Sequence, residues 1–378
     1  MRLVVTEEQE ELREALRRFF ADKSPSAEVR RLMGTAEGYD PGVWAQMAEQ
    51  LGLQGLAVPE EYDGAGFGVR ELAIVLEEMG RALVCAPYLS TVVLAGTALQ
   101  AAADNETKQE LLPGIAAGST LATLAWTEGE KWDLASVAMT ARPNALHFEE
   151  HPSEPGGWIL DGTKSYVLDG HIADLILVAA RTDAGLSLFS VDASAPGLTR
   201  TPLPVVDQTR KLARLDFADV PARLIRSDAE EALTHTLNIA AVGLAAEQLG
   251  GAQRTLEMTV EYAKVRKQFG RPIGSFQAIK HRCADMFVQV ESSRSAVLQA
   301  AAAADEDPSQ LPVAAALAKA FCSDAYFFTA GETIQIHGGI GFTWEHDAHL
   351  YFKRAKASQE LFGPPAHHRG HLAKLAGI

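Results

Sequence analysis

Residues 262–277 read YAKVRKQFGRPIGSFQ and mark the place where one long helical pattern ends and the next begins. On the N-terminal side, an apolar-striped stretch runs from about residue 230 to Arg266 without a proline. On the C-terminal side, a second helical pattern covers Phe276–Ala304 and a third covers about Val313–His337. Apolar residues at this spacing indicate helices with one buried face. Three such helices, joined by short breaks, predict an antiparallel bundle.

The part of the chain before this bundle changes character near residue 121. Residues 6–9, Thr-Glu-Glu-Gln, form a capping-box pattern ahead of leucines and phenylalanines at helical spacing. After Leu121, apolar residues occur in short runs separated by turns such as Asp161-Gly162, which indicates strands. The sequence therefore predicts an α+β multidomain fold. Its expected parts are an N-terminal all-α domain (residues 1–120), a middle β-barrel or sandwich domain (121–225) and a C-terminal four-helix bundle domain (226–378).

The charge balance and the distribution of apolar residues exclude some classes of partner. The 378 residues include 34 lysines and arginines against 49 aspartates and glutamates, which gives a net charge of −15. A chain this acidic is not expected to bind nucleic acid. The N-terminus opens into a Glu-rich helical pattern without the apolar core of a signal peptide. No run approaches the roughly 20 apolar residues of a membrane span, so a cytoplasmic protein without a membrane partner is expected.

Neither the cysteines nor the histidines predict a metal site. Cys85, Cys283 and Cys322 lie far apart and form no CxxC or zinc spacing, so they are expected to be reduced, buried thiols. The histidines near the end of the third bundle helix lack the HExxH spacing of a zinc enzyme.

Two segments carry residues suited to a nucleotide cofactor. In the first, residues 262–277, Arg266 can pair with a phosphate and a phenylalanine can cover a flavin or adenine ring. The second, residues 335–343, reads QIHGGIGFT and follows a helix, so it is not a Rossmann fingerprint. Its adjacent glycines can bring bare backbone amides close to a diphosphate. In both segments the alternative is an ordinary helix end with a glycine cap.

Taken together and in this order, the two segments resemble those of the acyl-CoA dehydrogenase family, and the resemblance covers nearly the whole chain. The family pattern RxQFGxPIxxFQ is kept from Arg266 to Gln277, and QxxGGxG is complete. The resemblance implies an FAD cofactor, whose adenosine diphosphate half these segments contact across a dimer interface. The residues expected to bind it are Arg266, Gln268, Phe269, Phe276, Gln335, Gly338 and Gly339.

The residues that face the flavin ring in this family are less well kept. The strand motif ending in Thr-Glu-Pro corresponds to Trp126-Thr127-Glu128-Gly129, which implies that Thr127 offers its hydroxyl and amide to the isoalloxazine, with Trp126 beside it. Trp132 stands where the family has a serine that meets coenzyme A. Tyr166 replaces the family's tryptophan and can still stack on the ring, but the threonine hydroxyl two positions later is lost.

The catalytic base of the family is missing from both of its usual positions. Family chemistry requires a carboxylate to remove the α proton of the thioester while flavin N5 takes a hydride from the β carbon. Phe362 and Ala240 occupy the two positions where members carry that carboxylate. Glu247 lies two turns past Ala240 on the same helix face, but roughly 10 Å further along the axis. It is a candidate base, a paired helix carboxylate or the lining of a polar acyl pocket. Glu360 is a weaker candidate, because it should point elsewhere.

Three interpretations of the activity remain open. The chain is a base-lacking subunit that completes the FAD site of a catalytic partner, a self-sufficient dehydrogenase with a base such as Glu247, or a flavin oxidase or monooxygenase on the same fold. The ending LFGPPAHHR, residues 361–369, resembles an actinobacterial-type branch whose members form heterotetramers in sterol side-chain breakdown. The resemblance further implies α,β-dehydrogenation of an acyl-CoA substrate, a homo- or hetero-tetramer, and electron-transfer flavoprotein as the electron acceptor.

Overall fold

The computed structural model describes residues 5–144 and 157–378 and divides the chain into two compact units. Unit 1 comprises residues 1–31, 69–84 and 241–378, and unit 2 comprises residues 32–68 and 85–240. The N-terminal third is therefore shared, since its first helix and residues 69–84 belong to the same unit as the helical bundle. The boundaries of the three expected domains stay a prediction.

The N-terminal third is helical, as the sequence predicts. Its elements are α1 (Glu7–Lys23), α2 (Ser26–Leu32), α3 (Pro41–Glu49), η1 (Glu60–Tyr62), α4 (Val69–Arg81), the π-helical η2 (Leu89–Gly96), α5 (Thr97–Ala102) and α6 (Asn105–Ala116). The capping box is confirmed: the hydroxyl of Thr6 accepts from the amide of Gln9 at 3.2 Å, and the Gln9 side chain accepts from the Thr6 amide at 3.0 Å.

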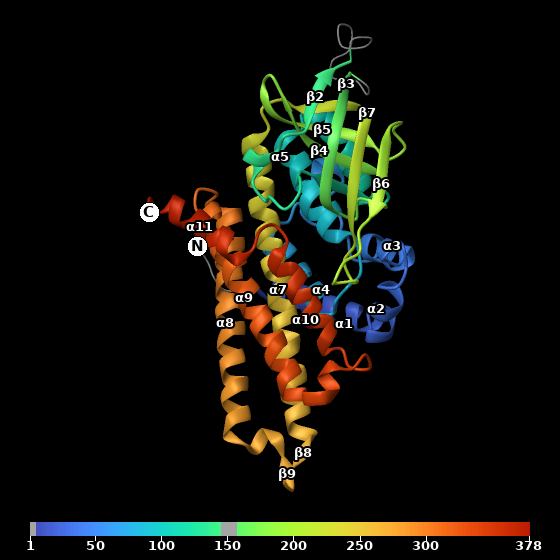
Figure 1. Cartoon of the computed structure of the whole chain (residues 1–378). Helices are drawn as coiled ribbons and strands as arrows, with labels where there is room; N and C mark the ends of the chain where they lie inside the picture. Colours follow the sequence, from blue (N-terminus) through green and yellow to red (C-terminus); the bar gives the residue numbers. More distant parts are fainter. Residues whose placement is uncertain (1–4, 145–156) are drawn as a thin grey trace. The chain divides into compact units, whose positions relative to one another are not determined.

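Unit 1 contains the predicted four-helix bundle. Its elements are α7 (Glu230–Val265, from residue 241 onward), α8 (Gln277–Glu306), α9 (Leu311–His337), η5 (Gly338–Phe342), α10 (Ala348–Glu360) and α11 (Pro365–Leu375). Gln248 contacts Ser323 and Thr259 contacts Thr333, so α7 and α9 run in the same direction. Helices α8 and α10 run oppositely to α9, as Figure 1 shows.

One bundle helix meets the test for a membrane span by length and composition alone. It is the stretch 311–342, and 61% of its most apolar window is buried. A core helix of a soluble protein passes the same test. The sequence-based expectation of no run approaching a span therefore overlooked the alanine-rich face of α9.

Helices α4 and α7 cross with their backbones in contact. A Cβ atom on Gly250 would lie 1.7 Å from the carbonyl oxygen of Glu77, and one on Gly80 would lie 2.0 Å from that of Glu247. Only glycine allows two helices to approach this closely. The crossing therefore fixes the position of α4 against the bundle.

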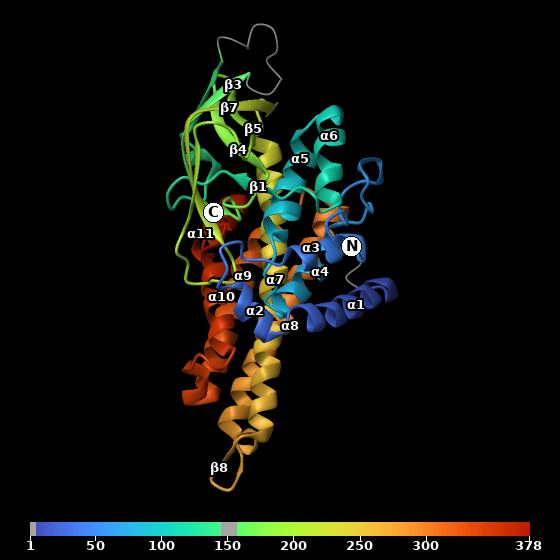
Figure 2. The same cartoon turned by 90° about the vertical axis from the view of Figure 1, so that its right-hand side faces the viewer.

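Unit 2 contains a sheet that closes on itself. Its strands are β1 (Ala122–Ala125), β2 (Thr140–Pro143), β3 (Trp158–Leu168), β4 (Leu175–Thr182), β5 (Gly185–Asp192), β6 (Leu198–Pro202) and β7 (Leu212–Arg226). The order β4-β2-β3-β7-β5 returns to β4, because β5 pairs with both β7 and β4. Strand β1 pairs in parallel with β4, and β6 extends β7. The predicted barrel is confirmed, and Figure 2 shows these strands around a common interior.

The barrel interior is filled by alternate side chains of its strands. Leu160, Val178, Phe189 and Leu215 are all fully buried there, as period-two alternation requires. Strand β3 is irregular between Lys164 and Val167, where its register against β7 shifts. Bulges of this kind change the direction in which a side chain points. Here the residues between Lys164 and Val167 lie beside the end of β1.

We expect Gly250→Ala to destabilise the protein by about 3 kcal/mol, because the added methyl group overlaps the backbone of α4. Chemical denaturation followed by circular dichroism measures the change. Gly370 in α11 is the matched control, since a Cβ there meets no atom within 4 Å. Gly370→Ala should raise stability by about 0.5–1 kcal/mol through helix propensity. Equal effects of the two substitutions would contradict the close crossing.

Candidate functional site

The first cofactor segment folds into a tight hairpin at the end of α7. Strand β8 (Lys267–Gln268) pairs with β9 (Arg271–Pro272), and η4 (Ile273–Ser275) leads into α8. The two turn residues, Phe269 and Gly270, have φ angles of 53° and 76°. Two left-handed residues in a two-residue loop are typical of a type I′ hairpin. The segment is therefore a hairpin that projects beyond the helix, and not only a glycine-capped helix end.

Aromatic and cationic side chains cover this hairpin and face outward. Phe269 is 92% exposed, although an aromatic residue with positive φ is energetically unfavourable. Its ring meets Phe276 edge-on at 6.1 Å, and the guanidinium of Arg271 lies 4.1 Å from the centre of the Phe276 ring. Arg266 and Gln268 are exposed as well. Burial does not explain why an aromatic residue is held in this position, because the ring is almost fully exposed.

The second segment ends α9 and also faces outward. The amide of Gly338 donates to the carbonyls of Gln335 and Ile334, and its φ of 62° requires glycine. The expected glycine cap is thus present at Gly338. Gly339 differs, because its φ is not positive and a Cβ there would meet no atom within 4 Å. The fold of this chain therefore does not require glycine at 339, and the exposed backbone there is open to an external group.

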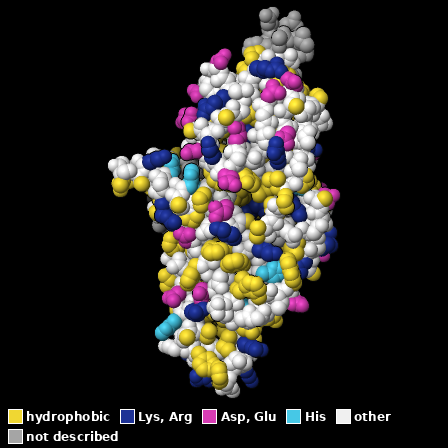
Figure 3. Space-filling model, viewed as in Figure 1, with side chains coloured by type: hydrophobic (Ala, Val, Ile, Leu, Met, Phe, Trp, Pro, Cys, Tyr) yellow, Lys and Arg dark blue, Asp and Glu magenta, His cyan; other side chains and the backbone are white. Residues whose placement is uncertain are grey.

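Both segments lie at the same end of the bundle. The ring of Tyr262 stacks on His337 at 4.3 Å, and its hydroxyl donates to the His337 carbonyl at 3.4 Å. This contact joins the end of α7 to the end of α9. Figure 3 shows hydrophobic side chains gathered over this end of unit 1. The large exposed apolar residues in these segments and directly after them are Val265, Phe269, Ile340, Phe342 and Trp344.

The residues expected at the flavin ring lie in unit 2, at the end of β1. Trp126 and Thr127 are each 4% exposed. The Thr127 hydroxyl donates to the Ser165 carbonyl, and the Ser165 amide donates to the Thr127 carbonyl at 2.9 Å. These two bonds tie the end of β1 to the irregular part of β3. The hydroxyl proton of Thr127 is thus already used within the chain, while the hydroxyl oxygen keeps lone pairs that can accept.

A cluster of three aromatic rings surrounds this strand end. Trp132 lies 5.8 Å from Trp126, and it stacks on Tyr166 at 6.3 Å with an angle of 28° between the ring planes. Tyr166 has a φ of 53° at the irregular part of β3. The tryptophan that replaces the family's serine is therefore packed on the tyrosine that was expected to stack on the flavin.

Sequence reasoning missed a buried ion pair beside this cluster. Lys164 is fully buried, and its ammonium donates to the Glu128 carboxylate at 2.6 Å. Burial lowers the pKa of Lys164 to about 8. Glu128 also accepts from the amides of Ala138 and Met139 at 2.9 and 3.0 Å, so it holds the loop after β1. Glu128 belongs to the strand motif described above, but β3 contains other polar residues, so no signal in the sequence showed that Lys164 is buried.

The two usual base positions hold buried, non-titratable side chains. Ala240 is fully buried in α7, within unit 2. Phe362 is 6% exposed and has a φ of 60° in the turn between α10 and α11. That turn is held by buried groups in unit 1: Lys319 donates to the Gly363 carbonyl at 3.2 Å, and His368 donates to the Phe362 carbonyl at 3.0 Å. Neither position can move a proton.

The candidate bases are engaged in ion pairs. The Glu247 carboxylate accepts from the Arg354 guanidinium at 2.6 Å, and both side chains are less than a tenth exposed. This arrangement supports the alternative of a paired helix carboxylate, because a base must be free to reach a proton. Glu360 pairs with Lys356 at 2.5 Å on the exposed face of α10. The role of Glu247 as a base stays a prediction.

No metal site is found among residues 5–144 and 157–378, where no group of three His, Cys, Asp or Glu side chains could hold an ion. The three cysteines are not in disulfides; Cys85 and Cys322 are buried as expected, whereas Cys283 is partly exposed and was wrongly expected to be buried. The expected cofactor residues fall into two groups. The cofactor residues of the hairpin and of the glycine segment lie in unit 1. Trp126 and Thr127, at the end of β1, lie in unit 2.

Family models for acyl-CoA dehydrogenases match most of the chain. The N-terminal domain model matches residues 6–119, the middle domain model 124–220 and the C-terminal domain model 231–376. Acyl-CoA dehydrogenase IpdE2 of Mycobacterium tuberculosis is 38% identical over 362 residues, which cover 95% of this chain and 94% of that protein.

Solved structures with the same fold include heteromeric complexes. A variant of the Tcur3481-Tcur3483 steroid ACAD is 34% identical with a TM-score of 0.89, and 99% of each chain is covered. The ChsE4-ChsE5 complex from Mycobacterium tuberculosis is 29% identical with a TM-score of 0.89, covering all of both chains. Butyryl-CoA dehydrogenase from Megasphaera elsdenii is 26% identical with a TM-score of 0.90, again over all of both chains.

We expect acid to destabilise the protein through His368. Burial lowers the pKa of His368 to about 3, and the nearby Lys319 ammonium acts in the same direction. The unfolded chain takes up a proton near pH 6.5, whereas the folded chain does not, so stability is lost as pH falls below about 6.5. The loss is at most about 1.4 kcal/mol per pH unit down to about pH 3.

Denaturation at pH 7 and pH 5 tests this expectation. In His368→Gln, whose amide can still donate to the Phe362 carbonyl, the drop in stability between the two pH values should be smaller by about 2 kcal/mol. The same substitution at the exposed His371 is the control. An unchanged pH dependence in His368→Gln would show that this histidine is not held neutral.

Proposed function

The chain belongs to the acyl-CoA dehydrogenase family, an FAD-dependent oxidoreductase family that acts on acyl-CoA, and from this premise we propose that it is a base-lacking subunit. In this proposal it completes the FAD site of a catalytic partner subunit, and the assembly carries out α,β-dehydrogenation of an acyl-CoA thioester. The observation that carries the proposal has two parts. The expected cofactor residues at the end of unit 1, called the cofactor edge below, face outward. The two usual base positions of the same chain hold buried side chains that cannot accept a proton.

The cofactor edge has the chemistry of a nucleotide site. Exposed Arg266 can bind a phosphate, and exposed Phe269 can stack on a ring of the cofactor. At Gly339 the backbone amides are open to an external group, although the fold of this chain does not require glycine there. A diphosphate is stabilised by cationic side chains and by bare backbone amides. These features fit FAD better than ordinary helix ends, which explain Gly338 but neither Phe269 nor Gly339. When bound, FAD supplies the acceptor for the hydride.

The exposed apolar side chains around this edge support a partner surface. Val265, Phe269, Phe342 and Trp344 are 64–92% exposed within one end of unit 1. Large apolar side chains that cluster on a surface mark sites of association. A subunit that lends half of a cofactor site must bind its partner through that same edge. The cofactor and the partner would therefore be held by one continuous surface.

The chain's own substrate side supports the second half of the proposal. Phe362 and Ala240 cannot accept a proton, and Glu247 is held by Arg354 in the interior of unit 1. Trp132 fills the position of the family's substrate-contacting serine and packs on Tyr166. We therefore assign the α-proton transfer to a carboxylate of the catalytic partner.

Further parts of the proposal rest on similarity. The assembly is a heterotetramer like that implied for the actinobacterial-type branch, in line with two of the similar structures, whose names each join two chains. The substrate is the acyl-CoA of a fatty acid or sterol side chain, the electron acceptor is electron-transfer flavoprotein, and the location is cytoplasmic. No observation favours a self-sufficient dehydrogenase or a flavin oxidase over this assignment.

Purifying the chain alone and together with its catalytic partner tests the proposal. We expect the lone chain to carry little flavin and to show no acyl-CoA-dependent dye reduction. The co-expressed pair should contain flavin and turn over. Full flavin and turnover in the lone chain would contradict the partner requirement, and Glu247→Gln in that active protein would then test Glu247 as its base.

Gly339→Ala should separate cofactor binding from folding. The added methyl group meets nothing within this chain, so the thermal unfolding midpoint should stay within about 2 °C. The flavin content of the assembly should fall at least about tenfold, because the methyl group occupies space at the diphosphate. Gly370→Ala in α11 is the control and should leave the flavin unchanged. Retention of flavin in Gly339→Ala would remove this segment from the site.

A further inference from the structure

A hollow of about 310 Å³ lies within unit 1, among α1, α4, α7 and α10. It is lined by none of the residues assigned to the cofactor or to proton transfer. Its volume is at the lower end of the range for small-molecule sites. The feature that distinguishes it from a packing defect is the chemistry of its wall.

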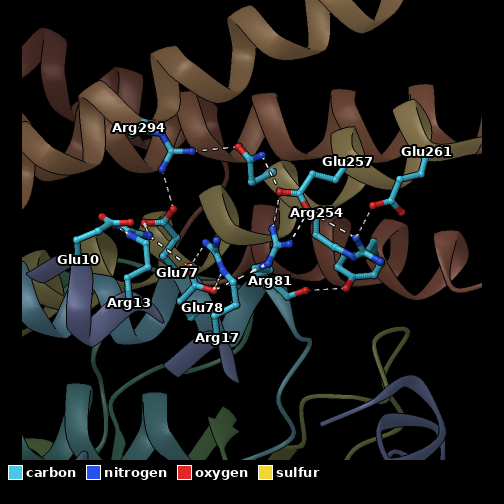
Figure 4. Close-up of polar contacts among 12 residues, drawn as sticks. Glu10, Arg13, Arg17, Glu77, Glu78, Arg81, Arg254, Glu257, Glu261 and Arg294 are labelled. Atoms are coloured by element: carbon cyan, nitrogen blue, oxygen red, sulfur yellow. Dashed lines mark hydrogen bonds and ion pairs between the residues drawn. The ribbon is translucent and has the colours of Figure 1, made fainter. Parts of the chain in front are cut away.

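Three guanidinium groups from three helices line this hollow. They belong to Arg17 of α1, Arg81 of α4 and Arg254 of α7. Figure 4 shows them within a network of arginines and glutamates that crosses the helices. Two carboxylates, Glu78 and Asp347, also line the hollow, so the lining carries one more positive than negative charge.

The arginines differ in how tightly they are paired. Arg17 binds Glu78 through two hydrogen bonds of 2.7 and 3.1 Å, and Arg81 binds Glu257 at 2.5 and 2.7 Å. Arg254 meets Glu257 and Glu261 at longer distances of 3.5 and 3.7 Å, and it also hydrogen-bonds the side chain of Tyr351, which lines the hollow. Charge-assisted hydrogen bonds are normally about 2.7–2.9 Å long. Arg254 is therefore the cation that can rearrange to bind an incoming anion.

The carboxylates of the lining are already neutralised. Asp347 accepts from Arg30 at 2.7 Å and from Ser26 at 2.6 Å. Glu78 is 1% exposed and is surrounded by Arg13 and Arg17. Neither carboxylate leaves a strong negative field to repel an anion. The side chain of Arg254 is 32% exposed, so it can be reached from solvent.

The hydroxyls of Ser24, Ser26 and Tyr351 in the lining already donate to other groups of the chain, and one part of the lining is apolar. This part is formed by Phe20, Leu83, Met258 and Leu350, none of which is more than 9% exposed. The apolar lining can contact a hydrocarbon chain, and the loosely paired guanidinium of Arg254 can bind an anionic group. The hollow therefore suits a molecule that has both. We propose that this hollow binds a small organic carboxylate, with its carboxylate on Arg254 and its apolar body against Met258 and Leu350.

Calorimetric titration of the full protein, in its assembled and flavin-loaded form where that form is required, tests the proposal. The probe is hexanoate, and hexanamide is the neutral isostere. We expect one saturable site that prefers hexanoate at least about tenfold. The titration is repeated with hexanoyl-CoA in excess, so that binding at the acyl-CoA site is recognised. Displacement of the probe by the thioester, or equal binding of acid and amide, would overturn the proposal.

Two variants locate the site. Arg254→Gln should weaken hexanoate binding about tenfold and leave hexanamide unchanged. Met258→Trp should fill the hollow and remove both. Arg18→Gln is the matched control, since it removes the same charge from a 73% exposed residue on α1 that does not line the hollow. Thermal unfolding checks that each variant is folded. Undiminished binding in both Arg254→Gln and Met258→Trp would place the probe elsewhere.

Discussion

The arrangement of unit 1 depends on the contact between α4 and α7, where Gly80 and Gly250 bring two helix backbones together. Because α4 is held this closely, its neighbouring side chains Glu77 and Glu78 are buried and must be neutralised. Arg13 and Arg294 supply opposite charges to Glu77 at 2.7 and 2.8 Å. The contact thus links the first helix of the chain to the bundle through ion pairs as well as through packing. It also explains why α1 and α4 belong to the same unit as the C-terminal helices.

The same helix that forms this contact carries three further features along its length. Glu247, beside the glycine crossing, pairs with Arg354 of α10. Arg254, about two turns further along α7, lines the hollow among α1, α4, α7 and α10. The helix then ends at the hairpin with exposed Phe269. Glu247, Gln248 and Thr259 face the interior and are paired with side chains of neighbouring helices, whereas Phe269 beyond the end of the helix faces outward. The chemistry that this unit can offer to another molecule is therefore concentrated at its exposed end and beside α1.

Sequence reasoning was most successful where local patterns determine the structure. The Thr6 capping box, the three long bundle helices and the barrel strands all follow from residue spacing and are confirmed. It failed where a single side chain acts through tertiary contacts. Lys319 and Lys164 are both fully buried, and nothing in their local sequence shows that they hold a turn and a loop. The left-handed conformations of Phe269 and Phe362 were also unforeseeable, because an aromatic residue adopts them only when the surrounding structure imposes them.

The turn around Phe362 illustrates how a fold can keep a rigid element without its catalytic group. Lys319 donates to Ser323 of its own helix, to the Gln359 carbonyl of α10 and to the Gly363 carbonyl of the turn. Removing this buried ammonium would take a donor away from acceptors in three elements, although Ser323 would still accept from Gln248. This cost does not depend on which side chain residue 362 carries. The turn is therefore required for the packing of α9, α10 and α11. Its conformation can persist after the carboxylate at its centre has been replaced, and this is why a preserved backbone there says nothing about proton transfer.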